Sequence, residues 1–263
     1  MVSIYLISAA IIIGAMLALW VISLLMKDAS IVDIFWGMGF AFVALAAYII
    51  ADGNPVRKQL ITLIAICWGF RLAFYLAWRN LGKGEDYRYV AMRKRHGGKF
   101  PLMSLVMVFG FQGVLMWVIS LPLQAAQAYG SAVNLNWIDW AGLCLWLIGF
   151  SFESLGDIQL ARFKSKPENQ GKVMDRGLWS FTRHPNYFGD SLVWWGFYLI
   201  AFSAGAWWSI VGPLLMTFLL MRVSGVALLE KNLKKNKPGY TDYVARTNAF
   251  FPWFPKKMPR SMN

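Results

Sequence analysis

Long apolar runs separated by short polar segments dominate the chain of 263 residues. An apolar stretch of about 20 residues is long enough to cross the hydrocarbon core of a bilayer as a helix. The runs are continuously apolar rather than alternating, so they predict helices and not a membrane β-barrel. We therefore expect an all-α, polytopic membrane protein with seven transmembrane helices, over residues 3–26, 29–51, 59–80, 102–128, 136–160, 186–203 and 206–229.

Basic residues concentrate in segments that a seven-span topology places on one side. Segments 81–101 and 161–185 carry six Lys or Arg each, and the tail after Glu230 carries eight. The positive-inside rule makes this side cytosolic, with the N-terminus outside and the C-terminus inside. Arg57 and Lys58 are the two exceptions. The first span lacks a basic start and stays apolar for more than 20 residues, which indicates a span rather than a cleaved signal peptide.

Composition supports the membrane assignment. Hydrophobic residues make up 58% of the chain and charged residues 15%, which excludes disorder and argues against an ordinary cytosolic enzyme. The net charge of +13 is what basic loops beside anionic lipid headgroups would give. We expect the bilayer as a partner, no nucleic acid and no obligatory protein partner. Cys67 and Cys144 have no CxxC partner or nearby His, so neither a metal site nor a disulfide framework is expected.

Some ionisable residues fall inside the expected spans, where a charge is costly and therefore indicates a functional site. Asp33 lies one turn into the second span, and Arg71 in the third span is the obvious candidate to pair with it. A purely structural ion pair is the alternative. Arg79 and Arg222 lie near cytosolic ends, where long basic side chains can reach the interface.

Glu153 and Asp157 are four residues apart and share one helix face near the cytosolic end of the fifth span. Their repulsion could be relieved by a cation, by a hydroxyl-rich ligand such as ribose, or by a metal. A metal is the least favoured of these, because no His lies nearby in the sequence. A simple salt bridge to Arg162 or Lys164 is the alternative.

Segment 175–190 has the strongest anion-binding character. Pro185 suits the first turn of a helix, where the free N–H groups and the helix dipole favour an anion. Arg176, Arg183 and His184 lie beside that turn in sequence, and Arg makes bidentate contacts to phosphate. The segment therefore predicts a phosphate clamp, with a basic interfacial cap as the alternative.

Acidic and aromatic residues follow this clamp. Asp190 lies about one turn later and Tyr198 eight residues further along, which places a candidate acid above the phosphates. In the tail, Tyr240, Tyr243 and Arg246 have helical spacing and could cover an adenine or a phosphate. An amphipathic interfacial helix is the alternative for the tail.

The segment Arg183-His184-Pro185-Asn186-Tyr187-Phe188-Gly189-Asp190 resembles the bacterial DUF1295 proteins, which are related to the steroid 5-alpha-reductase C-terminal family. Segments 32–37, 84–89, 157–160 and 246–252 extend the resemblance over most of the chain.

The resemblance implies a seven-helix NADPH enzyme of the bacterial inner membrane that reduces a C=C bond in a lipophilic enone. The chain is then one membrane domain, residues 1–263. Residues 1–128 lie on the substrate side, and residues 129–263 bind the cofactor in a cavity open to the cytosol.

The resemblance also assigns roles. Asp157 matches the cofactor-binding carboxylate, Lys164 the basic residue after it, and Asn186 the asparagine of the proline-asparagine-tyrosine motif. Together with the residues above, the expected cofactor-binding set is Asp157, Lys164, Arg176, Arg183, His184, Asn186, Tyr187, Asp190, Tyr240, Tyr243 and Arg246.

Three residues are candidate proton donors. Steroid reductases place a Glu and a Tyr against the substrate carbonyl. Here Asp33 matches the Glu, but the Tyr position is Trp68, whose indole has no acidic proton and can only donate a hydrogen bond. Related sterol reductases use an Asp and a Tyr eight residues later, which Asp190 and Tyr198 match. Asp190 with Tyr198 is the first choice of catalytic acid and Asp33 the second.

Two other function classes remain open. Isoprenylcysteine and phospholipid methyltransferases also carry an Arg-His-Pro-x-Tyr-x-Gly segment with a Glu downstream, which residues 183–189 and Glu230 match. These enzymes bind S-adenosylmethionine. A lipid-binding or structural membrane protein, whose buried charges only pair with one another, is the third possibility.

Overall fold

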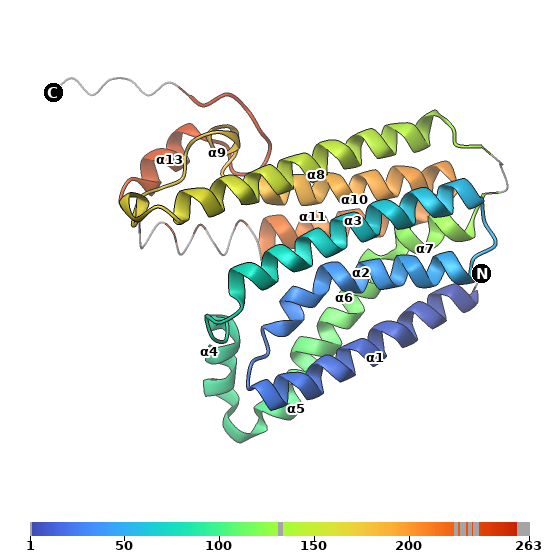
Figure 1. Ribbon diagram of the computed structural model, residues 1–263, viewed down its shortest axis with the longest axis horizontal. Helices are drawn as coiled ribbons and strands as arrows, with labels where there is room; N and C mark the ends of the chain where they lie inside the picture. The colour runs from blue at the N-terminus through green and yellow to red at the C-terminus, as the bar shows by residue number, and fades with distance from the viewer. Residues whose placement is uncertain are drawn as a thin grey trace. The chain divides into compact units, whose positions relative to one another are not determined.

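The computed structural model describes residues 2–130, 134–223, 226, 230, 233 and 237–256. These residues are almost entirely helical, with one isolated β-bridge between Thr182 and Asn248. The chain forms two compact units (Figure 1). The first comprises residues 1–140 and 198–212, and the second comprises residues 141–197 and 213–263.

Three long helices begin the first unit: α1 (Val2–Met26), α2 (Ile31–Ile50) and α3 (Pro55–Asn80). The backbones of α2 and α3 touch where Gly37 faces Gly69, since a Cβ on either glycine would overlap the carbonyl oxygen of the other. Small residues at such crossings allow membrane helices to pack closely without an interhelical hydrophobic effect.

The apolar run predicted at 102–128 is helical but not one regular helix. It consists of α5 (Phe100–Ser104), the π-helix η2 (Leu105–Gly110), α6 (Phe111–Ile119) and α7 (Leu121–Ala128). A proline occupies the first turn of both α5 and α7, where its missing N–H costs little.

Segment 81–101, expected as a basic loop, instead folds largely as α4 (Tyr87–His96) and the 3₁₀ turn η1 (Gly97–Lys99). Asp86 caps α4, because its side chain accepts a hydrogen bond from the Arg88 backbone N–H. The segment is polar, so its helix left no apolar periodicity in the sequence.

The two exceptions to the positive-inside pattern are accounted for by their contacts. The Arg57 guanidinium donates to both carboxylate oxygens of Asp139, at 2.8 and 3.0 Å, and to Ser203 Oγ at 3.1 Å. Lys58 donates to the Ala51 carbonyl and lies over the Tyr48 ring. Neither cation is therefore a solvated loop charge that would affect orientation.

Helices α8 (Trp137–Lys164) and α10 (Pro185–Ser203) form most of the second unit. They approach closely at Gly149 and Gly189, because a Cβ on Gly189 would overlap the backbone of Glu153 and Gly149. The remaining elements are η3 (Pro167–Asn169), α9 (Leu178–Phe181), α11 (Val211–Phe218), η5 (Leu219–Val223) and α13 (Tyr240–Arg246); α11 follows the turn η4 (Trp207–Ile210), which belongs to the first unit.

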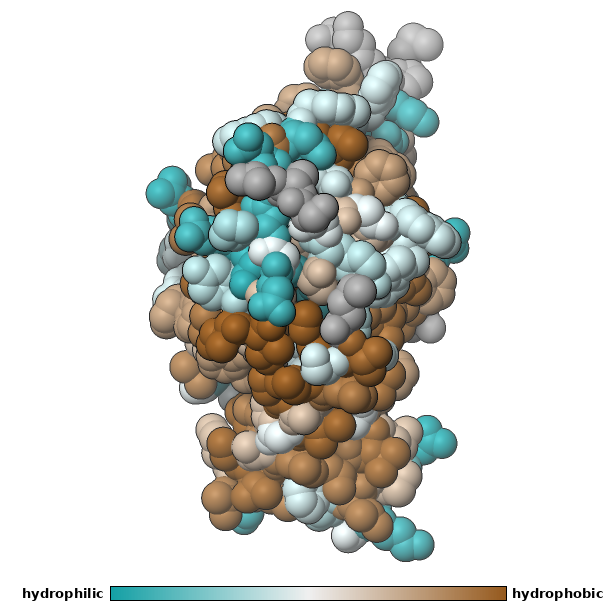
Figure 2. Space-filling view, turned by 90° about the vertical axis from the view of Figure 1, so that its right-hand side faces the viewer, coloured by the Kyte–Doolittle hydropathy of each residue, from teal (hydrophilic) through white to brown (hydrophobic). Residues whose placement is uncertain are grey.

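Five helical stretches are long and apolar enough to cross a membrane: Val2–Met26, Ile31–Ile50, Pro55–Asn80, Tyr87–Ala128 and Trp137–Lys164. Hydrophobic side chains form much of the surface drawn in Figure 2, as expected for helices that face lipid. The stretch Trp207–Val223 is apolar but shorter. The all-helical class is thus confirmed, with five helices that could span a membrane, while seven spans and their orientation remain predictions.

Candidate functional site

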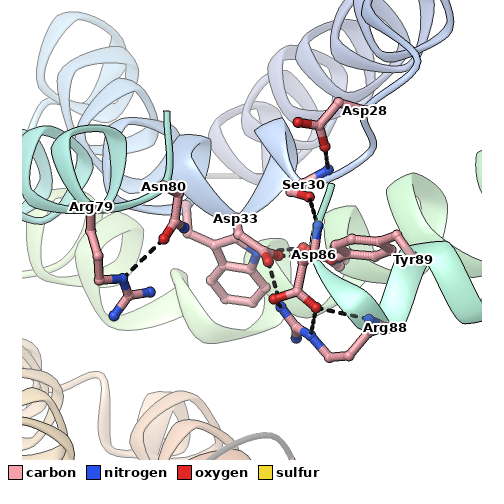
Figure 3. Close-up of polar contacts among 10 residues, drawn as sticks. Asp28, Ser30, Asp33, Arg79, Asn80, Asp86, Arg88 and Tyr89 are labelled. Atoms are coloured by element: carbon pink, nitrogen blue, oxygen red, sulfur yellow. Dashed lines mark hydrogen bonds and ion pairs between the residues drawn. The ribbon is translucent and has the colours of Figure 1, made fainter. Parts of the chain in front are cut away.

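A polar network surrounds Asp33 on the first turn of α2 (Figure 3). Arg88 Nη2 donates to Asp33 Oδ2 at 2.6 Å, and the Tyr89 hydroxyl donates to Asp33 Oδ1 at 2.8 Å. Arg88 and Tyr89 both lie on the first turn of α4, more than 50 residues from Asp33 in sequence. The fold therefore brings together a carboxylate, a guanidinium and a phenol.

The Tyr89 hydroxyl is fixed from a second side. Gln112 Nε2 donates to it at 3.1 Å, and the Gln112 Oε1 atom in turn accepts from Trp36 Nε1 at 2.5 Å. Gln112 lies on α6, two residues after the π-helix η2. The hydroxyl of Tyr89 thus accepts one hydrogen bond and donates another, so its orientation is defined by neighbouring side chains.

Arg88 is held between two carboxylates. Besides Asp33, its Nε donates to Asp86 Oδ1 at 2.8 Å, and its backbone N–H donates to the same oxygen at 2.9 Å. Burial alone would raise the pKa of Asp86, but the bonds from Arg88 and the charges of Arg88 and Arg79 hold that pKa below its ordinary value. The side chains of Arg88 and Asp33 keep 39% and 23% of their surface exposed while Tyr89 is buried, so the network is only partly enclosed.

The start of α4 is anchored to the turn between α1 and α2. The Asp86 N–H donates to Ser30 Oγ at 2.7 Å, and Glu85 Oε1 accepts from the Ala29 N–H at 2.9 Å. Arg93 completes the anchor with an ion pair to Glu85 at 2.8 Å. These contacts keep Arg88 and Tyr89 in register with Asp33.

Asp33 was expected to be a site residue, but its partners differ from expectation. Its guanidinium comes from Arg88, whereas the Arg71 guanidinium lies over the Tyr75 ring at 5.5 Å. Trp68 is buried, 5.9 Å from the Phe40 ring. Arg88 and Tyr89 were not expected in the site, because their segment was predicted to be a loop. The capping Asp86 at its start was a local signal of a helix.

In the second unit the structure brings together two predicted cofactor residues. The Asn186 side-chain amide, on the first turn of α10, donates to Asp157 Oδ1 on α8 at 3.1 Å. Asp157 and Glu153 are both buried. A buried carboxylate held by an amide is well suited to hydrogen bonding a hydroxyl or carboxamide of a ligand.

Arg183 and His184 converge on Glu230. Arg183 Nε donates to Glu230 Oε1 at 2.7 Å, and His184 Nε2 lies 3.4 Å from the same oxygen. Burial would raise the pKa of Glu230, but its hydrogen bonds to His184 and Arg183 and their charges lower it. Arg183 also donates to the carbonyls of Thr247 and Val244. Its donors thus serve protein acceptors, while Arg176 and Lys164 are exposed cations.

The predicted tail residues pack into the protein. Tyr240 and Tyr243 are buried, and the Tyr243 hydroxyl donates to the Trp179 carbonyl. Burial, followed by the charge of Glu230, raises the pKa of Tyr240 to about 12. Arg246 pairs with Asp175 at 2.5 Å. These contacts join α13 to α9 and the segment before it.

The other predicted residues lie on α10. The Tyr187 ring stacks on the His184 ring, with centroids 5.5 Å apart. The Tyr198 hydroxyl donates to the Trp207 carbonyl at 3.3 Å. Asp190 is half-buried on the second turn, and eight residues of helix separate it from Tyr198 by about 12 Å along the axis.

An all-helical protein with helices long and apolar enough to span a membrane, and with partly buried polar networks, is thus defined. The chain belongs to the DUF1295 family, since the family model described as "Protein of unknown function (DUF1295)" matches residues 19–247. It is 26% identical over 271 residues to "Uncharacterized protein C594.04c" of Schizosaccharomyces pombe, covering 89% of this chain and 75% of the yeast protein. No solved structure matches the chain.

Proposed function

We propose that this chain is a membrane-embedded, NADPH-dependent reductase of a C=C bond conjugated to a carbonyl in a lipophilic substrate. The observation that carries the proposal is the Tyr89 hydroxyl, held between Asp33 and Gln112 at 2.8 and 3.1 Å. The proposal includes seven transmembrane helices in a bacterial inner membrane, with the N-terminus outside. Substrate enters from the bilayer.

Tyr89 is the proposed proton donor. When bound, the cofactor supplies a hydride to the β-carbon of the enone, and negative charge develops on the substrate oxygen. The Tyr89 O–H turns from Asp33 to that oxygen, stabilises the charge and transfers its proton. Gln112 continues to donate to the phenol oxygen and so stabilises the phenolate that forms. Asp33 is then a positioning residue, and Asp190 with Tyr198 is the alternative acid.

The chain offers residues that suit a nicotinamide dinucleotide. Asp157 and Asn186 provide a buried acceptor and an amide for a ribose hydroxyl or the carboxamide. Lys164 and Arg176 are the exposed cations for phosphates. Tyr187 and His184 form a stacked pair beside the first turn of α10. Arg183, bonded to Glu230, shapes this segment rather than contacting phosphate directly.

A second candidate is a methyltransferase that uses S-adenosylmethionine on a lipid acceptor. One observation favours it: Glu230 contacts both Arg183 and His184, so the Arg-His-Pro segment and the downstream Glu form one cluster. The same cluster also serves a structural role, because Arg183 binds carbonyls of the C-terminal segment.

Thermal unfolding of the detergent-purified protein with NADPH, NADH or S-adenosylmethionine separates these candidates. A ligand at a hundred times its Kd stabilises the folded state by about 2.7 kcal/mol. We expect a shift with NADPH that Asp157→Asn removes and Tyr89→Phe retains. A shift with S-adenosylmethionine alone would overturn the reductase. No shift with any of the three would favour a non-enzymatic membrane protein.

A further inference from the structure

Three aromatic side chains that lie close together in the C-terminal segment are exposed. Phe251, Trp253 and Phe254 keep 64%, 68% and 75% of their surface exposed. All three fall within four residues, and such an apolar cluster on a surface marks an interaction site. This segment (residues 251–256) is called the aromatic tail below.

The backbone of the aromatic tail is fixed while its side chains point outward. The Trp253 N–H donates to the Phe181 carbonyl and the Lys256 N–H to the Arg246 carbonyl, both at 2.9 Å. The Phe254 ring meets the Phe181 ring edge-on at 5.9 Å. The exposure of the aromatic side chains is therefore a property of the folded second unit.

The tail lies beside the membrane-spanning helices at a definable depth. Phe251 contacts the ring of Phe188 on the first turn of α10, which contacts Phe152 on α8. With its 28 residues, α8 is about 42 Å long, roughly 12 Å more than the hydrocarbon core. If all of this excess length extends out of the hydrocarbon core at the basic C-terminal end of α8, Phe152 lies about 6 Å inside the hydrocarbon boundary.

We propose that the aromatic tail inserts into the interfacial layer of the bilayer. Trp concentrates at this depth in membrane proteins because its indole ring is largely apolar and carries a polar N–H, and the two Phe rings add apolar surface of the kind that interfacial segments bury. Lys256 ends the tail and Lys257 follows in sequence, and these cations favour anionic headgroups. The tail thus attaches the segment containing α9 and α13 to the lipid surface.

Spin-label depth measurements on the full chain test this proposal. A label is placed at Trp253→Cys in a Cys67→Ser, Cys144→Ser background, reconstituted into nanodiscs of phosphatidylcholine and phosphatidylglycerol. Glu168→Cys, exposed in η3 and expected to face water, is the matched control. We expect the label at 253 to be reached by oxygen and protected from a water-soluble nickel chelate, and the label at 168 to show the reverse.

A second label at Phe254→Cys guards against a local effect of one substitution, and circular dichroism checks folding of each variant. Accessibility to nickel at both 253 and 254 equal to that at 168 would overturn the proposal. Protection that is present in discs holding several copies but absent in discs holding a single copy would instead assign the tail to a contact between copies. Protection that persists at one copy per disc supports insertion into lipid.

Discussion

Two ion pairs in the first unit use the same chemistry in opposite ways. Arg57 and Asp139 have side chains only 1% and 0% exposed, and their contact is bidentate. The side chains of Arg88 and Asp33 are 39% and 23% exposed, and the other carboxylate oxygen of Asp33 accepts a hydrogen bond from the Tyr89 hydroxyl. Both pairs join residues far apart in the sequence, yet one is enclosed and the other is open.

The contrast shows that a charge within an apolar run does not by itself identify a functional site. The enclosed pair is completed by structural groups, since Asp139 also accepts the Asn136 N–H and Arg57 donates to Ser203. The open pair instead orients the Tyr89 hydroxyl, a group that can donate a proton. The neighbours of each pair, rather than its charges, distinguish a structural role from a chemical one.

Breaking the enclosed pair should have the largest effect on stability. Arg57→Met leaves the Asp139 carboxylate buried without its guanidinium, which typically costs about 3–5 kcal/mol. Denaturant unfolding in detergent micelles, followed by circular dichroism, measures this loss. The double variant Arg57→Met, Asp139→Leu removes both charges and should recover most of it.

The double variant also guards against a simple packing effect. If Arg57→Met and the double variant lose the same stability, packing by the Arg57 side chain, and not its charge, stabilises this end of the unit. In that case the charges of Arg57 and Asp139 would not stabilise the fold, and the contrast with Asp33 and Arg88 would not hold.

The open pair should affect turnover more than stability. In the proposed reductase reaction Tyr89 is the proton donor, so Tyr89→Phe should lower turnover by about 10²-fold or more. One lost hydrogen-bonding group should cost about 1 kcal/mol in unfolding free energy. NADPH oxidation with an enone substrate, beside denaturant unfolding, measures both effects.

Tyr87→Phe is the matched control, since Tyr87 lies on the same turn of α4 with 57% of its surface exposed. It should leave turnover and stability unchanged. Normal turnover in Tyr89→Phe would move the acid to Asp190 and Tyr198. A loss of NADPH-dependent stabilisation in Tyr89→Phe would point to a role in binding instead.

The helices of the first unit could be predicted from the sequence where apolar length defined them. The runs at 3–26 and 29–51 match α1 and α2 within two residues at each end. Helix α4 could not be found this way, because its sequence YRYVAMRKRH has no apolar face long enough to show a period. Its start is stabilised by the local Asp86 cap and by the tertiary contact between Glu85 and the Ala29 N–H.

The candidate site residues show the same difference between what local sequence indicates and what the fold adds. Asp157 and Asn186 were expected as cofactor residues from the family resemblance, and they are hydrogen bonded across two helices. The phosphate role expected of Arg183 rested on local neighbours, whereas its acceptors at Glu230 and Thr247 come from 47 and 64 residues away. Residue chemistry indicated where charges matter, but only the fold supplies their partners.

Breaking the open pair should cost less stability than breaking the enclosed one. Arg88→Met leaves Asp33 able to reach water, so the expected loss is about 1 kcal/mol or less. The unfolding assay used for Arg57→Met allows direct comparison. A loss as large as that of Arg57→Met would show that the open network is a structural element, and would weaken the proposed role of Tyr89.

The smallest predicted effect is a pH dependence at the Asp86 cap. The folded-state pKa of Asp86 is lowered, so ionised Asp86 stabilises the fold above its unfolded value of about 3.9, and this contribution is lost as the pH falls through the lower folded value. Asp86→Asn keeps the capping oxygen and removes the charge. The unfolding free energy of the wild type at pH 7 should therefore exceed that of Asp86→Asn by less than about 1 kcal/mol, and the difference should close below pH of about 4. A gap that stays constant over this pH range would show that the difference between the two side chains does not come from the Asp86 charge.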